Sequence, residues 1–122
     1  MSARSILMLL LFGMVTGDGC IVTVTRNAYD SCNAGDSCEY GTSCQSSNYT
    51  RSGAPGNLCT ITCTDTAQCP VPLSGAVALC VIVAPSSTGK CYYTCPSGSS
   101  FSCPGSTYCN SIPNSTINIC VP

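Results

Sequence analysis

The sequence contains no histidine and no tryptophan, and only 7% of its 122 residues are charged. Without histidine, the chain cannot form a Ser-His-Asp triad, a Cys-His protease site, a His-ligated zinc site or a histidine pH switch. Its formal net charge of −1 provides neither a basic surface for nucleic acid nor a polybasic membrane patch. Cys-x-x-Cys and Cys-x-Cys pairs, typical of redox and thiolate metal sites, are missing as well.

Carboxylates are also few. Acid–base chemistry would have to use Asp18, Asp30, Asp36, Glu39 or Asp65, and four of these crowd the N-terminal region in turn-like sequence. Solvated surface charge is the better interpretation of such residues. The sequence therefore predicts no catalytic residue, no cofactor, no metal and no enzymatic activity.

The first 17 residues have the pattern of a secretory signal peptide. Arg4 supplies a positive charge, residues 6–15 form an apolar run, and small residues end at Gly17. The run is too short to cross a hydrocarbon core about 30 Å thick as a helix. A single-span anchor is therefore the weaker alternative, and the residues before Cys20 fit a bacterial lipobox poorly. We expect cleavage after Gly17, no stable membrane insertion afterwards, and an extracellular protein.

Thirteen of the 122 residues are cysteine, above the roughly 8–10% that marks a disulfide scaffold in a short secreted chain. Leu, Ile, Val and Phe are few after the predicted cleavage site at Gly17. Apolar burial alone therefore cannot offset a backbone ordering cost of about 1–2 kcal/mol per residue. Disulfides stabilise such a chain by lowering the entropy of its unfolded state. The sequence predicts a small disulfide-rich fold of strands and loops, with little or no helix after the signal peptide.

Twelve cysteines fall into three groups of four, and we predict three cysteine repeats over residues 32–59, 63–91 and 95–120, called segments 1, 2 and 3 below. The joints between them have equal length, and segments 2 and 3 share Cys-Pro at their second cysteine. Stacked units of this kind are typical of repeat proteins. The predicted architecture is an elongated array, preceded by an N-terminal strand over residues 18–31. The grouped cysteines are Cys32, Cys38, Cys44 and Cys59; Cys63, Cys69, Cys80 and Cys91; and Cys95, Cys103, Cys109 and Cys120.

The joint sequences, Thr-Ile-Thr and Tyr-Tyr-Thr, are rich in β-branched and aromatic residues and predict short strands. At a rise of about 3.3 Å per residue, the two cysteines of an extended joint lie roughly 13 Å apart. A disulfide needs Cα atoms within about 7 Å, so a joint pair cannot bond to itself. Further strands are expected over residues 21–25, 78–83 and 117–121, the second of them buried.

Four cysteines allow three pairings. We favour bonds from first to third and from second to fourth within each segment, because crossed bonds restrain a core-poor unit more fully than two sequential loops.

The unit Cys-x5-Cys-(Pro)-x5-Cys-x10-Cys, joined by Cys-x3-Cys, resembles the tandem EB-type modules of invertebrate secreted proteins. The resemblance covers residues 32–120 and depends on cysteine spacing together with Cys69-Pro70 and Cys103-Pro104. Segment 2 departs from the pattern with ten residues between its second and third cysteines. The resemblance implies an extracellular, non-enzymatic module and fixes neither ligand nor disulfide connectivity.

Three features outside the repeat could be modified or bind a partner. Asn48 and Asn114 begin Asn-x-Ser/Thr sequons, which predict N-glycosylation in a secreted chain. Arg51, followed by Ser52, lies in the longest loop between cysteines, where a rigid disulfide-bounded loop could present it to a trypsin-like protease. A solvated surface arginine is the alternative interpretation. Cys20 is left over from the repeats, and we expect an intermolecular disulfide; pairing within its own chain is the alternative.

These features favour a structural function. A secreted chain with little net charge lacks the repulsion that keeps proteins monomeric, and exposed strand edges can pair with other chains. We expect a non-enzymatic protein that associates with itself or with other extracellular proteins in a filament, matrix, coat or wall. The alternative is a soluble effector, such as a protease inhibitor that uses Arg51.

Overall fold

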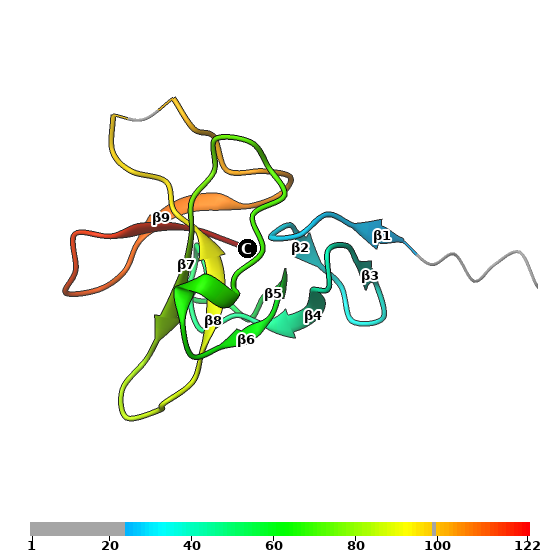
Figure 1. Cartoon of the computed structure of the whole chain (residues 1–122), viewed down its shortest axis with the longest axis horizontal. Helices are drawn as coiled ribbons and strands as arrows, with labels where there is room; N and C mark the ends of the chain where they lie inside the picture. Colours follow the sequence, from blue (N-terminus) through cyan, green and yellow to red (C-terminus); the bar gives the residue numbers. More distant parts are fainter. Residues whose placement is uncertain (1–23, 99) are drawn as a thin grey trace, which may run out of the picture.

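The computed structural model describes residues 24–98 and 100–122 of the chain. Within these ranges, short strands and one turn of 3-10 helix alternate with loops (Figure 1). The strand-rich, nearly helix-free fold predicted from the sequence is therefore confirmed. The elements are β1 (Thr25–Arg26), β2 (Ser31–Cys32), β3 (Ser37–Cys38), β4 (Ser43–Ser46), β5 (Asn57–Thr60), β6 (Thr62–Cys63), η1 (Thr66–Gln68), β7 (Ala78–Ile82), β8 (Gly89–Tyr93), β9 (Tyr108–Ser111) and β10 (Asn118–Val121).

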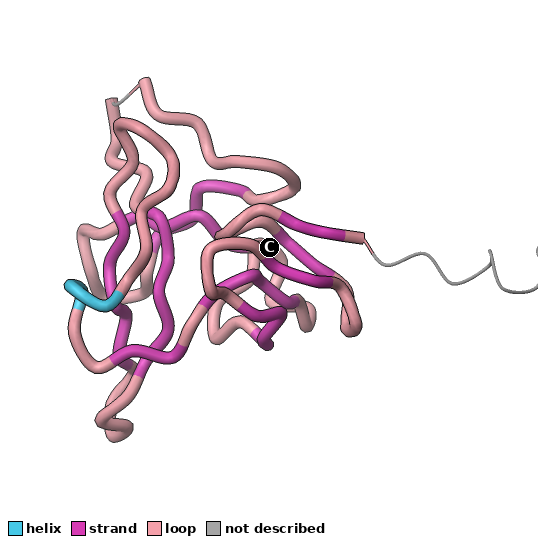
Figure 2. Tube along the Cα trace, turned by 45° about the vertical axis from the view of Figure 1, so that its right-hand side comes forward, coloured by secondary structure: helices cyan, strands magenta, loops and turns pink. Residues whose placement is uncertain are grey.

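The strands form small separate sheets, which Figure 2 shows joined by long loops. Segment 1 contains an antiparallel sheet of order β2-β5-β4, segment 2 one of order β6-β8-β7, and segment 3 the hairpin β9-β10. A short parallel pair, β1 and β3, ties the N-terminal residues to segment 1. No helix in the described part of the chain is long and apolar enough to cross a membrane.

The same strand register occurs in all three segments. The third and fourth cysteines lie directly opposite each other in an antiparallel pair: Cys44 and Cys59, Cys80 and Cys91, and Cys109 and Cys120. The strand of the fourth cysteine pairs on its other side with the residues around the first cysteine, through β2, β6 and the isolated bridge between Thr94 and Ile119.

Six disulfides join the twelve cysteines of the described residues in the pairing that the sequence analysis favours. Bonds from first to third cysteine have Cα–Cα distances of 5.9, 6.0 and 5.9 Å. Bonds from second to fourth have distances of 5.6, 5.6 and 5.5 Å. The pairs are Cys32–Cys44, Cys38–Cys59, Cys63–Cys80, Cys69–Cys91, Cys95–Cys109 and Cys103–Cys120.

The segments share their buried core, in contrast to the elongated array expected from the sequence. One cluster combines Ala28 and Tyr29 of the N-terminal residues with cysteines of segments 2 and 3 and with Tyr93 of the joint between these segments. A second cluster takes Leu58 from segment 1, Val81 from segment 2, Tyr92 from the joint that follows it, and Ile119 and Val121 from the end of the chain. Each segment has too few apolar side chains for a core of its own, and the short joints leave no linker between segments. They therefore pack against one another.

Three tyrosines fill the centre of the molecule. Tyr29, Tyr92 and Tyr93 are 0%, 0% and 1% exposed. The ring centroids of Tyr29 and Tyr93 lie 4.1 Å apart, and the Tyr29 hydroxyl donates to the Pro70 carbonyl at 2.6 Å. These contacts bridge sequence-distant parts of the chain, so the aromatic residues supply the burial that the scarce aliphatic residues cannot.

The strands expected from the sequence are largely present. β10 lies within residues 117–121, and β7 covers residues 78–82. β7 is not fully buried, however: it is the edge strand of its sheet, and Ile82 is 41% exposed. The turn that precedes β7 covers this edge, because the hydroxyl of Thr66 in η1 accepts from the Cys80 amide at 3.1 Å. Of the expected strand at 21–25, the described residues contain Thr25, which begins β1.

Candidate functional site

The carboxylates of the described residues largely hold the backbone in place. Asp36 accepts from the Asn33 amide at 2.9 Å and from Arg26 at 3.2 Å. The amide hydrogen bond, followed by Arg26, lowers the pKa of Asp36 below its usual value. Asp30 accepts from the Ser106 amide at 3.0 Å and so joins the N-terminal strand to segment 3.

The other two carboxylates of the described residues, Asp65 and Glu39, differ in role. Asp65 caps η1 by accepting from the Ala67 amide at 3.2 Å. Glu39 is exposed, and its carboxylate has no hydrogen-bond or ion-pair partner among the described residues. Asp18 lies outside the described residues. The acidic residues thus offer little beyond structural hydrogen bonds and one unpaired surface charge.

The cysteine sulfurs gather in three clusters, one in each segment. In each cluster, the sulfur atoms of three cysteines drawn from both disulfides lie within 4.8 Å of one another. All of them are in disulfide bonds, and a disulfide sulfur is not the thiolate that ligates metal. Cys20 lies outside the described residues, and no described cysteine is left to pair with it.

The two sequons are both on the surface. Asn48 is exposed, and its backbone amide donates to the Tyr92 hydroxyl at 3.3 Å. Asn114 is exposed in the turn between β9 and β10, where its φ of 60° is one that asparagine tolerates better than most residues. Both side chains are open to the attachment of a glycan.

Arg51 is held against segment 3. Its backbone amide donates to the Pro122 carbonyl at 3.0 Å, and its guanidinium carbon lies 4.1 Å above the centre of the Tyr108 ring. This cation–π contact keeps the side chain on the surface of its own molecule. A protease inhibitor needs a basic side chain that projects freely into the enzyme, so this geometry weighs against that use of Arg51 and of the adjoining Ser52.

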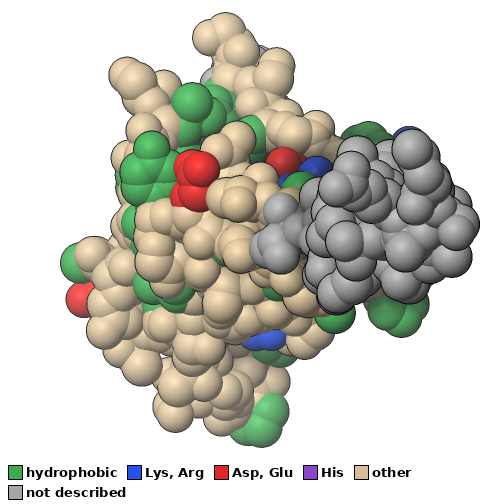
Figure 3. All heavy atoms as spheres, turned by 90° about the vertical axis from the view of Figure 1, so that its right-hand side faces the viewer, with side chains coloured by type: hydrophobic (Ala, Val, Ile, Leu, Met, Phe, Trp, Pro, Cys, Tyr) green, Lys and Arg blue, Asp and Glu red, His purple; other side chains and the backbone are tan. Residues whose placement is uncertain are grey.

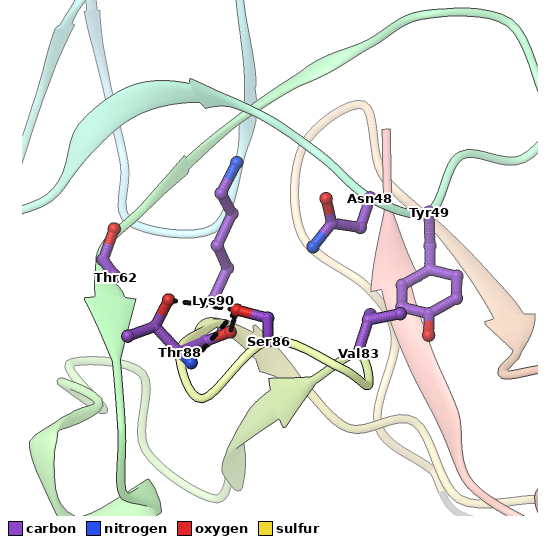
Figure 4. A pocket seen from close by; sticks show the side chains of 8 residues that line it. Asn48, Tyr49, Thr62, Val83, Ser86, Thr88 and Lys90 are labelled. Atoms are coloured by element: carbon purple, nitrogen blue, oxygen red, sulfur yellow. Dashed lines mark hydrogen bonds between the residues drawn. The ribbon is translucent and has the colours of Figure 1, made fainter.

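A polar groove lies between segments 1 and 2, with a volume of about 510 Å³. Figure 4 shows Lys90, Ser86, Thr88 and Asn48 around it, with Val83 and Tyr49 on one side. The Lys90 ammonium donates to the Ser46 carbonyl. On the same wall, the Ser86 hydroxyl donates to the Thr88 carbonyl and accepts from the Thr88 amide. The polar groups of this groove therefore mostly satisfy one another.

A second, apolar groove has a volume of about 200 Å³ and lies where all three segments meet. Tyr40 and Leu73 form its rim and are 62% and 44% exposed. The hydroxyl of buried Tyr93 accepts from the Leu73 amide at 3.4 Å and so fixes the rim. Its lining is Asn27, Ala28, Tyr40, Pro72, Leu73, Tyr93 and Pro104.

Further apolar side chains close to Leu73 in the sequence are exposed. Val71 and Val77, from the same loop as Leu73, are 48% and 63% exposed. Figure 3 shows hydrophobic side chains gathered on the upper part of one face, beside acidic groups. Sequence reasoning missed this surface, because its residues come from separate segments and no local pattern connects them.

Comparison with known proteins gives no further guide: no protein-family model, no curated protein and no solved structure matches this chain. The resemblance to EB-type modules therefore stays a prediction based on cysteine spacing.

Proposed function

We propose that the chain is a secreted, non-enzymatic structural protein that self-associates or embeds in an extracellular assembly such as a filament, matrix, coat or wall. The apolar groove is the observation that carries this proposal, since its rim residues Tyr40 and Leu73 remain exposed. Contiguous apolar surface on a folded chain is typical of sites that another protein covers.

The disulfide framework supports the extracellular part of the proposal. Six disulfides are compatible with an oxidising compartment, and the N-terminal sequence has the features of a signal peptide. In such a compartment, Asn48 and Asn114 would carry N-glycans.

The charge distribution supports association. The chain has nine charged residues in all, and Arg26 and Asp36 neutralise each other in an ion pair at 3.2 Å. Copies of this protein therefore repel one another weakly at neutral pH.

Sedimentation velocity of the secreted, fully oxidised protein over a wide concentration range tests this function. We expect oligomers whose share grows with concentration. A monomer at every concentration, with no co-assembly in the extracellular material of its source, would contradict the proposal.

Cys20 adds a covalent component to the same proposal. Because the described cysteines pair among themselves, we expect Cys20 to link two chains. Non-reducing electrophoresis should show a dimer that disappears in Cys20→Ser, with all six disulfides of the described residues retained. Scrambled disulfides in this variant would instead place Cys20 within the framework of its own chain.

A further inference from the structure

We propose that an N-glycan on Asn48 lies along the polar groove between segments 1 and 2, with its first N-acetylglucosamine residue packed against Tyr49 and Val83. This inference rests on the secreted location in the proposed function, because N-glycans are attached to secreted chains. It gives the two sequons different roles: the glycan on Asn48 is part of the folded structure, and the glycan on Asn114 extends into solvent.

The backbone of the Asn48 sequon is fixed by the core of the molecule. The hydroxyl of buried Tyr92 accepts from the Asn48 amide at 3.3 Å and lies 3.0 Å from the Ser47 hydroxyl. The Ser47 hydroxyl donates in turn to the Tyr49 carbonyl at 2.5 Å. The rings of Tyr49 and Tyr92 meet edge to face, with centroids 6.3 Å apart. The Asn48 side chain therefore starts from a defined position.

The Asn48 carboxamide points into the polar groove, toward the wall that carries Ser86 and Thr88 (Figure 4). The side chain is exposed and makes no hydrogen bond to the described residues, in contrast to most polar groups of the groove. On glycosylation, its nitrogen loses one proton and bonds to the anomeric carbon of the sugar, while the pyrophosphate of the glycosyl donor leaves. Asn48 also borders a hollow of about 350 Å³, but its carboxamide is directed into the polar groove.

The polar groove has the space and the chemistry for a saccharide. Its volume of about 510 Å³ lies within the roughly 300–1,000 Å³ of small-molecule sites. Tyr49 and Val83 form an apolar side on which the C–H face of a pyranose ring can lie and lose contact with water. On the other side, the Thr88 hydroxyl has only a long contact of 3.4 Å with the Ser86 hydroxyl, which a sugar hydroxyl can replace.

Covalent attachment selects the occupant of this groove. An open groove of this kind makes too few contacts to hold a free saccharide against the entropy lost on binding. A sugar attached to Asn48 has already lost that freedom, and its effective concentration in the groove is on the order of millimolar or higher. Weak contacts with Tyr49 and Val83 are then enough to keep it in place.

Asn114 offers an internal control. It is exposed in the turn between β9 and β10, and it lines neither the polar groove nor the apolar groove. The residues that follow it, Ser115 and Thr116, are exposed as well. A glycan on Asn114 therefore begins at an exposed turn and has no groove beside it.

Release of the two glycans by an endoglycosidase that cuts between the first two sugars tests the proposal. The substrate is the folded, oxidised protein secreted by a eukaryotic host, and peptide mass mapping follows both sites in one sample. We expect release at Asn48 to be about tenfold slower than at Asn114, the ratio for a sugar that spends about nine-tenths of its time in the groove. After reduction and denaturation, the two rates should be similar.

Urea denaturation gives an independent measurement. Asn48→Gln should lower the urea midpoint, because it removes the docked glycan and no hydrogen bond of the side chain. Asn114→Gln should leave the midpoint nearly unchanged. This comparison separates docking in the groove from the general effect of a glycan on an unfolded chain.

Two adjacent substitutions test the groove without changing a sequon. Val83→Asp places a charge on the apolar side of the groove and should raise the rate of release at Asn48 toward the rate at Asn114. Ile82→Asp is the matched control, because Ile82 is 41% exposed, against 40% for Val83, and does not line the groove. It should leave the rate at Asn48 unchanged. Disulfide mapping checks that both variants are folded.

Equal release at both sites of the folded protein would overturn the proposal, and so would an unchanged urea midpoint in Asn48→Gln. Slow release at Asn48 that persists in Val83→Asp would place the sugar outside the polar groove and overturn it as well. A secreted protein without a glycan on Asn48 excludes this inference but leaves the proposed function intact. A chain that carries no glycan and does not reach the medium contradicts the extracellular location in the proposed function.

Discussion

At the scale of single residues, the buried tyrosines connect packing with ionisation. Burial raises the pKa of Tyr29 far above its usual value, and it also raises those of Tyr92 and Tyr93. Hydrogen bonds from Ser47 and the Asn48 amide oppose the shift at Tyr92 without cancelling it. The folded protein therefore keeps these three phenols protonated under conditions in which an exposed tyrosine ionises.

This difference predicts a loss of stability at alkaline pH. The folded-state pKa values of these tyrosines exceed the unfolded value of about 10. Their contribution to the free energy of unfolding is therefore complete below pH about 10 and declines as pH rises through the folded-state pKa values. Urea denaturation across this range, with phenolate absorbance as a second signal, measures the decline. Stability that stays constant while the buried phenols ionise would contradict the expectation.

Tyr29→Phe separates the hydroxyl from the ring. Loss of the hydrogen bond to the Pro70 carbonyl should lower the free energy of unfolding at neutral pH by about 1 kcal/mol. The difference in the free energy of unfolding between Tyr29→Phe and the unmodified protein should become smaller at high pH, because the variant has one fewer group to ionise on unfolding. Tyr40→Phe is the control, since Tyr40 is 62% exposed and should leave stability unchanged at neutral pH.

At the scale of elements, the β7–β8 hairpin depends on Gly89. A Cβ atom at this position would collide with the backbone of Val81 and Ile82 on the paired strand, and a backbone cannot move aside as the end of a side chain can. Gly89→Ala should therefore destabilise the protein by about 1–3 kcal/mol, the usual range for overpacking. Thermal or urea unfolding measures the loss, and Ser87→Ala in the same exposed turn should cost much less.

Some features of these elements could be predicted from the sequence and others could not. The strand positions and the cysteine pairing could be predicted, because β-branched runs and cysteine spacing are local signals. The edge position of β7 and the shared core could not, since they depend on which segments pack together. The apolar groove was missed for the same reason: Tyr40, Leu73 and Pro104 meet only in the folded chain. The stacking of the Arg51 guanidinium on the Tyr108 ring could not be predicted either, because the two residues are distant in sequence.

At the scale of the whole molecule, the shared core makes the segments interdependent. Leu58, Val81 and Ile119 pack in one cluster although each belongs to a different segment. Removing the disulfide Cys95–Cys109 by a double alanine substitution should therefore lower the unfolding temperature of the entire chain. Calorimetry should show one transition in both proteins. Two separate transitions, with segments 1 and 2 unchanged, would indicate that the segments fold independently.

The crowding of sulfur atoms in each segment has a consequence for how the crosslinks form. Thiol–disulfide exchange requires a thiolate to reach a sulfur of an existing bond, and here sulfurs of both bonds lie within 4.8 Å. A segment with one bond made still has two free thiols, and either of them, as a thiolate, can therefore exchange with the bonded sulfurs locally. During oxidation, disulfide pairings within a segment can therefore interconvert reversibly, and this exchange stops when no free thiol is left in the segment.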